Sequence, residues 1–136
     1  FDTKGKEVAN TFYWRSNDKY EGRKTLTGPT SSGFEDLSKL KQVQLKTRYQ
    51  TYQEGDRHFI KAEIKNPSST VAFFTQLQLL GQDKKPVRPS FYTDNFFSLL
   101  PGESKTVIIE TAASDMPSEP TFVVKGWNIK PSSFKL

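Results

Sequence analysis

Three polar residues near the middle of the chain, Tyr92, Asp94 and Asn95, are the first candidates for a functional site. A carboxylate beside an amide offers oxygen ligands to a cation, and with a tyrosine hydroxyl it could bind a sugar or a neighbouring domain. Calcium, however, takes about six to eight oxygen ligands, and this pair supplies few. Short polar side chains where a loop enters a strand also bond to nearby backbone N–H groups and hold a turn. The sequence favours this second interpretation.

Other candidates for catalysis or metal binding are sparse. His58 is the single histidine and the chain has no cysteine, so neither a catalytic triad nor ordinary zinc ligation is indicated. The acidic residues fall mostly in turns, and the periodicity places no pair of carboxyls on a rigid inward face, as glycoside hydrolysis would need. The sequence therefore predicts no catalytic residue, no metal site and no cofactor in this stretch of chain.

Aromatic residues make up 13% of the chain, which raises the alternative of a carbohydrate-binding surface. Exposed rings can stack against the apolar faces of sugars. Several rings are adjacent in sequence, such as Phe73 with Phe74 and Phe96 with Phe97, and adjacent pairs split between the two faces of a sheet. Many of the rings are therefore expected in the core. The candidates for contact with a sugar or another domain are Tyr92, Asp94, Asn95 and Trp127.

Alternation of apolar and polar residues dominates the chain and predicts strands. Residues 43–50 and 58–65 alternate on either side of a break at Gly55, which is free to adopt a positive φ, so they predict a hairpin. Further strands are predicted within residues 71–80, 106–110 and 122–129. In the first of these, one face is expected to carry Val71, Phe73, Thr75, Leu77 and Leu79.

One segment has helical features. Ser32 is a possible N-cap and Glu35 follows it at the capping-box spacing, after a long polar connection. About seven short strands with regular turn signals predict an all-β fold, an immunoglobulin-like antiparallel β-sandwich with one short helix in the long connection. We expect a single domain over residues 1–136. Residues 1–41 would hold an N-terminal strand, the connection and the helix, and residues 42–130 would form the sandwich core.

Charge and hydropathy favour neither nucleic acid nor a membrane as a partner. The net charge is +5, but the lysines are spread along alternating strands and turns, where they protect sheet edges. No apolar run approaches the roughly 18 residues that a membrane span needs. The chain starts at Phe1 with no leader-like segment, so we expect it to be a piece of a longer protein.

Five segments follow one another in an order that resembles a known family: NTFYWRS, FEDLSKLKQVQLKT, AEIKNPSSTVAFFTQLQLL, FYTDNFFSLLPGESKTVIIE and VKGWNI. Together they resemble the C-terminal immunoglobulin-like domain of glycoside hydrolase family 2 enzymes, in the branch of exo-β-D-glucosaminidases and β-mannosidase-like members. The resemblance covers nearly the whole chain, and its most specific block is YTDNFFSLLPGES. The sequence differs from the family pattern between Tyr20 and Pro29, where the family often has more aromatic residues.

The resemblance implies a division of labour. In such enzymes both catalytic glutamates lie on a (β/α)₈ barrel domain that has no counterpart here, so no catalytic residue is carried over. The expected function is a non-catalytic accessory domain whose partners are other domains of a retaining β-glycosidase acting on β-linked glucosaminides or mannosides. A carbohydrate-binding module with an aromatic platform and a free-standing adhesion or interaction domain are the alternatives. Glycan-degrading relatives and the lack of an Asn-x-Ser/Thr acceptor lead us to expect export from a bacterium.

Overall fold

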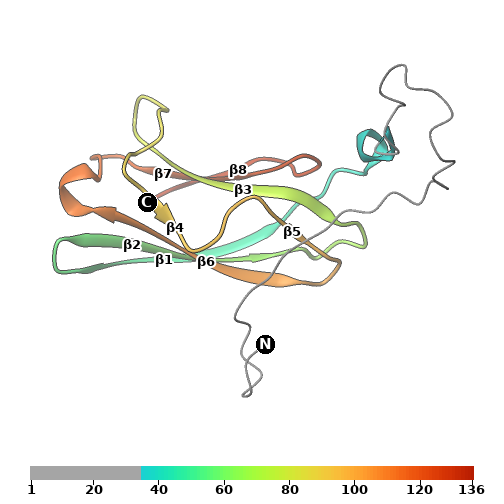
Figure 1. Ribbon diagram of the computed structural model, residues 1–136, viewed down its shortest axis with the longest axis horizontal. Coiled ribbons are helices and arrows are strands. Elements are labelled where there is room, and N and C mark those ends of the chain that lie inside the picture. The colour runs from blue at the N-terminus through green and yellow to red at the C-terminus, as the bar shows by residue number, and fades with distance from the viewer. Residues whose placement is uncertain (1–34) are drawn as a thin grey trace, which may run out of the picture. The chain divides into compact units, whose positions relative to one another are not determined.

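The computed structural model describes residues 35–136, of which residues 41–136 form one compact unit. This unit is a sandwich of two four-stranded sheets, with strand orders β1-β2-β6-β4 and β5-β3-β7-β8 (Figure 1). Every pairing between named strands is antiparallel. The all-β immunoglobulin-like sandwich predicted from the sequence is thus confirmed, with eight strands in the described residues.

The elements are short and joined by turns. No helix within residues 35–136 is long and apolar enough to cross a membrane. The predicted helix is a 3-10 helix of five residues, and its expected cap Ser32 lies outside the described residues. In chain order the elements are η1 (Glu35–Lys39), β1 (Lys46–Glu54), β2 (Arg57–Lys65), β3 (Ala72–Leu80), β4 (Phe91–Tyr92), β5 (Phe97–Leu99), β6 (Ser104–Ala112), η2 (Ala113–Asp115), β7 (Thr121–Lys125) and β8 (Ser132–Lys135).

The first two strands form the hairpin that the alternating residues predicted. Gly55 lies in the turn with a φ of 57°, a conformation that favours glycine because it has no Cβ. β2 then pairs with β6 over its whole length. Ile60, Ala62 and Ile64 point into the sandwich and are fully buried, as predicted.

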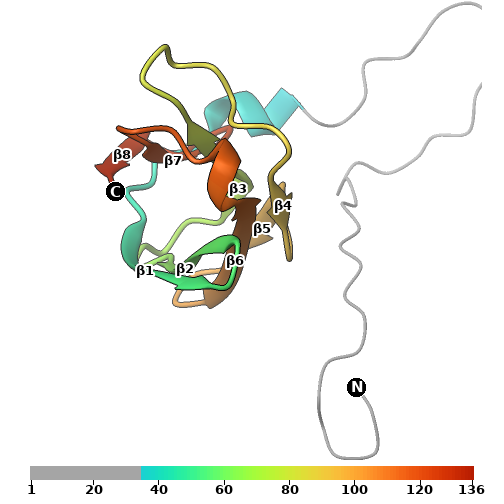
Figure 2. The same cartoon turned by 90° about the vertical axis from the view of Figure 1, so that its left-hand side faces the viewer.

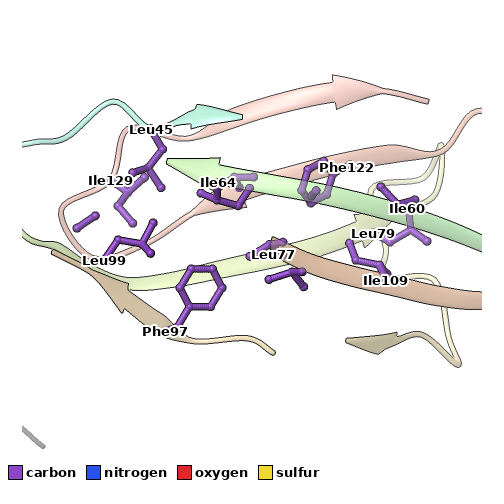
Figure 3. Packing of buried hydrophobic residues seen from close by; sticks show 14 of the residues in the cluster. Leu45, Ile60, Ile64, Leu77, Leu79, Phe97, Leu99, Ile109, Phe122 and Ile129 are labelled. Carbon is purple, nitrogen blue, oxygen red and sulfur yellow. The ribbon is translucent and has the colours of Figure 1, made fainter. Parts of the chain in front are cut away.

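The core fills the space between the two sheets (Figure 3). Ile60, Ile64 and Ile109 come from one sheet and pack against side chains of the other. Figure 2 shows β7 and β8 on the opposite side of the core from β1 and β2. Each fully buried aliphatic or aromatic side chain contributes about 1.5–3 kcal/mol relative to an exposed one. The opposing side chains of the second sheet include Leu77, Leu79, Leu99, Phe122 and Val124.

One strand departs from the predicted alternation. β3 pairs with β5 at Ala72 and Thr75, and the register shifts between these residues. Phe74 has a φ of 58°, so the chain forms a bulge that adds a residue and reverses the side-chain alternation. Ala72 is therefore buried, while Val71 and Phe73, which were expected on the same face as Leu77 and Leu79, are only half-buried.

Two buried asparagines that the sequence analysis did not single out hold the loops at one end of the sandwich. The side-chain amide of Asn66 donates to the carbonyl oxygen of Leu99 at 3.0 Å. The amide of Asn128 donates to the carbonyl oxygen of Val71 at 2.8 Å, and its oxygen accepts from the N–H of Phe73 at 2.8 Å. The bond from Phe73 thus gives a backbone donor next to the bulge in β3 a side-chain acceptor.

Candidate functional site

The polar residues predicted from the sequence lie along β3. The side chain of Asn95 spans Leu77, since its oxygen accepts from the Leu77 N–H at 2.8 Å and its nitrogen donates to the Leu77 carbonyl at 3.0 Å. The hydroxyl of Tyr92 accepts from the N–H of Leu79 at 3.0 Å. Two side chains thus supply the hydrogen bonds that a neighbouring strand would give to β3 beyond its pairing with β5.

Asp94 bonds to its own loop and to a side chain of β6. One carboxylate oxygen accepts from the N–H of Asn95 at 2.7 Å, and the other forms an ion pair with Lys105. The Lys105 ammonium also lies 5.1 Å from the centre of the Phe97 ring. The oxygen of Asn95 accepts from the N–H of Phe96 at 3.0 Å, so both short polar side chains bond to backbone N–H groups as expected for a turn. A further role of these residues in contact with a sugar or another domain stays a prediction.

The environment of Tyr92 keeps its phenol protonated. Burial raises the pKa of Tyr92 above its ordinary value of 10.0, while the hydrogen bond from the Leu79 N–H acts in the opposite direction. A phenol that is more difficult to ionise is a poor general base near neutral pH. The arrangement therefore suits a fixed hydrogen-bond acceptor better than a catalytic group.

Trp127, the fourth candidate, lies in a separate groove next to these residues. It is 63% exposed and lies beside Phe74 and Phe96, each 50% exposed; we call these three residues the aromatic cluster. The rings of Phe74 and Phe96 have centroids 5.6 Å apart and planes inclined at 52°. Together with Gln76 and Lys125 the aromatic cluster borders a shallow groove of about 240 Å³.

The two candidate areas meet at Phe96. This residue follows Asn95 directly, and it borders both the groove beside Trp127 and a second shallow depression that Tyr92 and Asn95 line. The structure therefore places Tyr92, Asn95 and Trp127 on one continuous stretch of surface, with Phe96 between them. From the sequence, Phe96 was only one of many aromatic residues. Alternation predicts that Phe96 and Phe97 point in opposite directions, but it does not predict which of the two is exposed.

Two rings of the aromatic cluster project from unfavourable backbone conformations. Phe74 and Phe96 have φ values of 58° and 57°, in the left-handed region that costs a residue with a Cβ about 1–2 kcal/mol. Close packing fixes the bulge at Phe74. A Cβ on Gly126 would lie 2.9 Å from the Phe74 carbonyl oxygen and would collide with the Ile129 side chain, so only glycine fits there.

Metal and acid–base candidates are few in the part of the chain that the structure describes. Among residues 35–136 no group of three or more His, Cys, Asp or Glu side chains could hold a metal ion. His58 lies on β2, between Gln53 of β1 and Thr111 of β6 in the pairing of the sheet. The residue thus occupies an ordinary ladder position.

A family model for the Ig-fold domain of exo-beta-D-glucosaminidase matches residues 25–129, which is more than half of the chain. The chain belongs to this family. An exo-beta-D-glucosaminidase of Streptomyces avermitilis is 31% identical over 137 residues, covering 93% of this chain and 15% of the relative. One from Amycolatopsis orientalis is 29% identical over 138 residues, covering 93% of this chain and 13% of the relative.

Solved structures give the same result for the fold. The crystal structure of the Amycolatopsis orientalis exo-chitosanase CsxA is 25% identical with a TM-score of 0.69, covering 74% of this chain and 12% of that chain. A variant of the same enzyme in complex with PNP-beta-D-glucosamine gives a TM-score of 0.80 at 25% identity, and covers 99% of this chain and 17% of that one.

The coverage sets the scale of this domain. The chain spans about 15% and 13% of the lengths of the two relatives from Streptomyces and Amycolatopsis. It is thus an Ig-fold domain of exo-beta-D-glucosaminidase type that corresponds to a small part of a larger enzyme. Most of each relative lies outside the region that this chain matches.

Proposed function

We propose that this chain is a non-catalytic accessory domain of a larger enzyme that hydrolyses β-linked glucosaminides. The match of residues 25–129 to the exo-beta-D-glucosaminidase Ig-fold family carries this proposal. The site geometry supports it, because the side chains of Tyr92 and Asn95 form hydrogen bonds with the backbone of β3. Asp94 forms an ion pair with Lys105. The chemistry then belongs to other domains of the same polypeptide.

The proposal extends to the mechanism and class of the parent enzyme. We place the parent among glycoside hydrolases of family 2 with retention of configuration, because the block from Tyr92 to Ser104 resembles that family. A retaining enzyme uses two carboxyls about 5–5.5 Å apart, one of them as a nucleophile. A β-mannoside is the competing substrate class within the same resemblance.

The test uses the full-length polypeptide that carries this chain. We expect it to hydrolyse p-nitrophenyl β-D-glucosaminide, and the first-formed sugar to be the β-anomer by NMR. A matched preparation of residues 1–136 should release no nitrophenol under the same conditions. Hydrolysis by residues 1–136 alone would overturn the accessory role. A full-length protein that hydrolyses only the β-mannoside would overturn the substrate class, and a first-formed α-anomer would overturn retention.

Sugar binding is a second candidate function, favoured by the exposure of the aromatic cluster. Two details of the geometry weigh against it. The rings of Phe74 and Phe96 are inclined at 52°, so they form no flat platform for a sugar. Lys125 borders the groove, and a lysine ammonium repels the protonated amines of glucosamine units. Accessory docking therefore accounts for the exposed rings better than a glucosamine-binding site does.

A further inference from the structure

The two outer faces of the sandwich differ in charge. On the sheet formed by β1, β2 and β6, outward side chains alternate with the buried Ile60, Ala62 and Ile64. Many of these outward side chains are charged and exposed, as expected for a face in water. They include Lys46, Arg48, Lys61, Glu63 and Lys65.

The outer face of the other sheet is nearly uncharged along β3 and β7. Strand pairing places Gln76 beside Lys125, Gln78 beside Val123, and Leu80 beside Thr121. These side chains alternate with the buried Leu77, Leu79, Phe122 and Val124, so they point outward. We call this surface the β3–β7 face. Lys125 is its single charged side chain among these three pairs.

Each end of the β3–β7 face is hollowed. At one end the aromatic cluster borders the groove of about 240 Å³ that contains Lys125. At the other end a larger groove of about 500 Å³ has apolar walls from Leu80, Pro120 and Val123, and the charged residues Lys84, Glu119 and Lys135 also border it. A sheet face with one charged side chain among its three β3–β7 pairs, and with a partly apolar groove at each end, differs from the charged outer face of the other sheet.

The backbone at the aromatic cluster adds an independent argument. Phe74 and Phe96 both adopt positive φ, and both rings remain half-exposed, so little burial within this domain offsets the backbone cost. Asparagine or glycine would adopt the same φ more favourably. Two neighbouring phenylalanine rings at such positions indicate that burial against another surface supplies the free energy that offsets the backbone cost.

We propose that the β3–β7 face, including the aromatic cluster, is the surface on which a neighbouring domain of the same polypeptide docks. This inference rests on the proposed accessory function. The docking surface of the neighbour presents apolar side chains to the rings of Phe74, Phe96 and Trp127. It also presents a carboxylate or a carbonyl to Lys125, whose ammonium would otherwise lose water without gaining a partner.

The length of the relatives favours an intramolecular partner. This chain matches about 15% of the Streptomyces enzyme, so a neighbouring domain is covalently present at high effective concentration. Interfaces between domains of one chain bury roughly 600–1,500 Å² and are more polar than obligate dimer interfaces. A face of glutamines with an aromatic cluster at one end matches that composition.

The test measures accessibility in the full-length polypeptide. The chain contains no cysteine, so a cysteine placed at Gln78 reports on the centre of the β3–β7 face and one at Lys61 reports on the opposite face. Maleimide labelling is followed by mass spectrometry of the two tryptic peptides. We expect Q78C to react at least about tenfold more slowly than K61C, because a docked face excludes the reagent.

Two matched variants identify the surface. Phe96→Asn should bring the labelling rate of Q78C to within about threefold of K61C, since removing a ring from an interface core weakens docking. Phe91→Asn should leave it unchanged, because Phe91 is 57% exposed but pairs with Glu110 on the outer face of the first sheet. Phe74→Asn is the second variant if Phe96→Asn does not fold, as judged by its thermal unfolding.

Each other outcome overturns the docking proposal. Equal rates for Q78C and K61C would show that the β3–β7 face is not covered by a neighbour. Equal effects of Phe96→Asn and Phe91→Asn would show that the aromatic cluster is not part of a docking surface. Protection that falls on dilution would indicate a second copy, and protection that needs added glucosamine oligosaccharide would indicate a sugar site. Assaying p-nitrophenyl β-D-glucosaminide with the same preparations separates the two proposals, because hydrolysis without protection refutes docking alone.

Discussion

Replacing Asn95 with alanine tests whether the polar residues before β5 serve the fold. The change removes both bonds to Leu77, at 2.8 and 3.0 Å, and a third to the N–H of Phe96. The two bonds to Leu77 are part-buried, and each unsatisfied backbone group costs about 1–3 kcal/mol. Water can replace the exposed bond to Phe96. We therefore expect Asn95→Ala to lower the free energy of unfolding by about 2–6 kcal/mol.

Urea unfolding followed by far-UV circular dichroism measures this loss, and Tm should fall by at least about 8 °C. Ser98→Ala is the matched control, because it removes one exposed bond of 3.3 Å from the N–H of Phe74 and should cost less than about 0.5 kcal/mol. A loss below about 0.5 kcal/mol for Asn95→Ala would refute the reasoning, as it would show that the side chain does not support β3.

Three further substitutions test neighbouring contacts. Tyr92→Phe should destabilise by about 1 kcal/mol at pH 7. Because the folded-state pKa of Tyr92 is raised, the wild-type contribution is present below pH 10 and declines above it, so urea midpoints of the two proteins should converge at higher pH. Gly126→Ala should cost about 1–3 kcal/mol in thermal unfolding through its clash with Ile129 and the Phe74 carbonyl, whereas Gly55→Asn should not. Asp94→Ala should cost about 0.5–1.5 kcal/mol, and equal midpoints for variant and wild type would contradict the role of its bonds to Asn95 and Lys105.

The sandwich could be predicted from the sequence because side-chain alternation reports burial directly. In β2 the inward set Ile60, Ala62 and Ile64 follows from period two and a glycine turn, both local properties of the chain. The same rule fails in β3, because the bulge at Phe74 packs against Gly126, which follows β7 and is distant in sequence. No pattern within residues 71–80 carries that information.

In the candidate site, too, contacts between sequence neighbours were predicted and contacts between distant residues were not. Asp94 and Asn95 were expected to bond to local backbone, and their bonds to Asn95 and Phe96 N–H groups agree. The bonds of Asn95 to Leu77 join residues 18 apart in sequence, and alternation gives no account of contacts at that range. Likewise, the three residues of the aromatic cluster come from separate segments of the chain, and local patterns do not show that they meet. Only Trp127 was therefore named as a site candidate from the sequence.

Titration of residues 1–136 with glucosamine oligosaccharides, followed by amide NMR shifts, tests the accessory role most directly. We predict no saturable shift at millimolar ligand for the amides of Phe74, Phe96 or Trp127, because the inclined rings of Phe74 and Phe96 form no flat platform and Lys125 repels amino sugars. Saturable shifts at these residues would contradict it and make the domain a sugar-binding module.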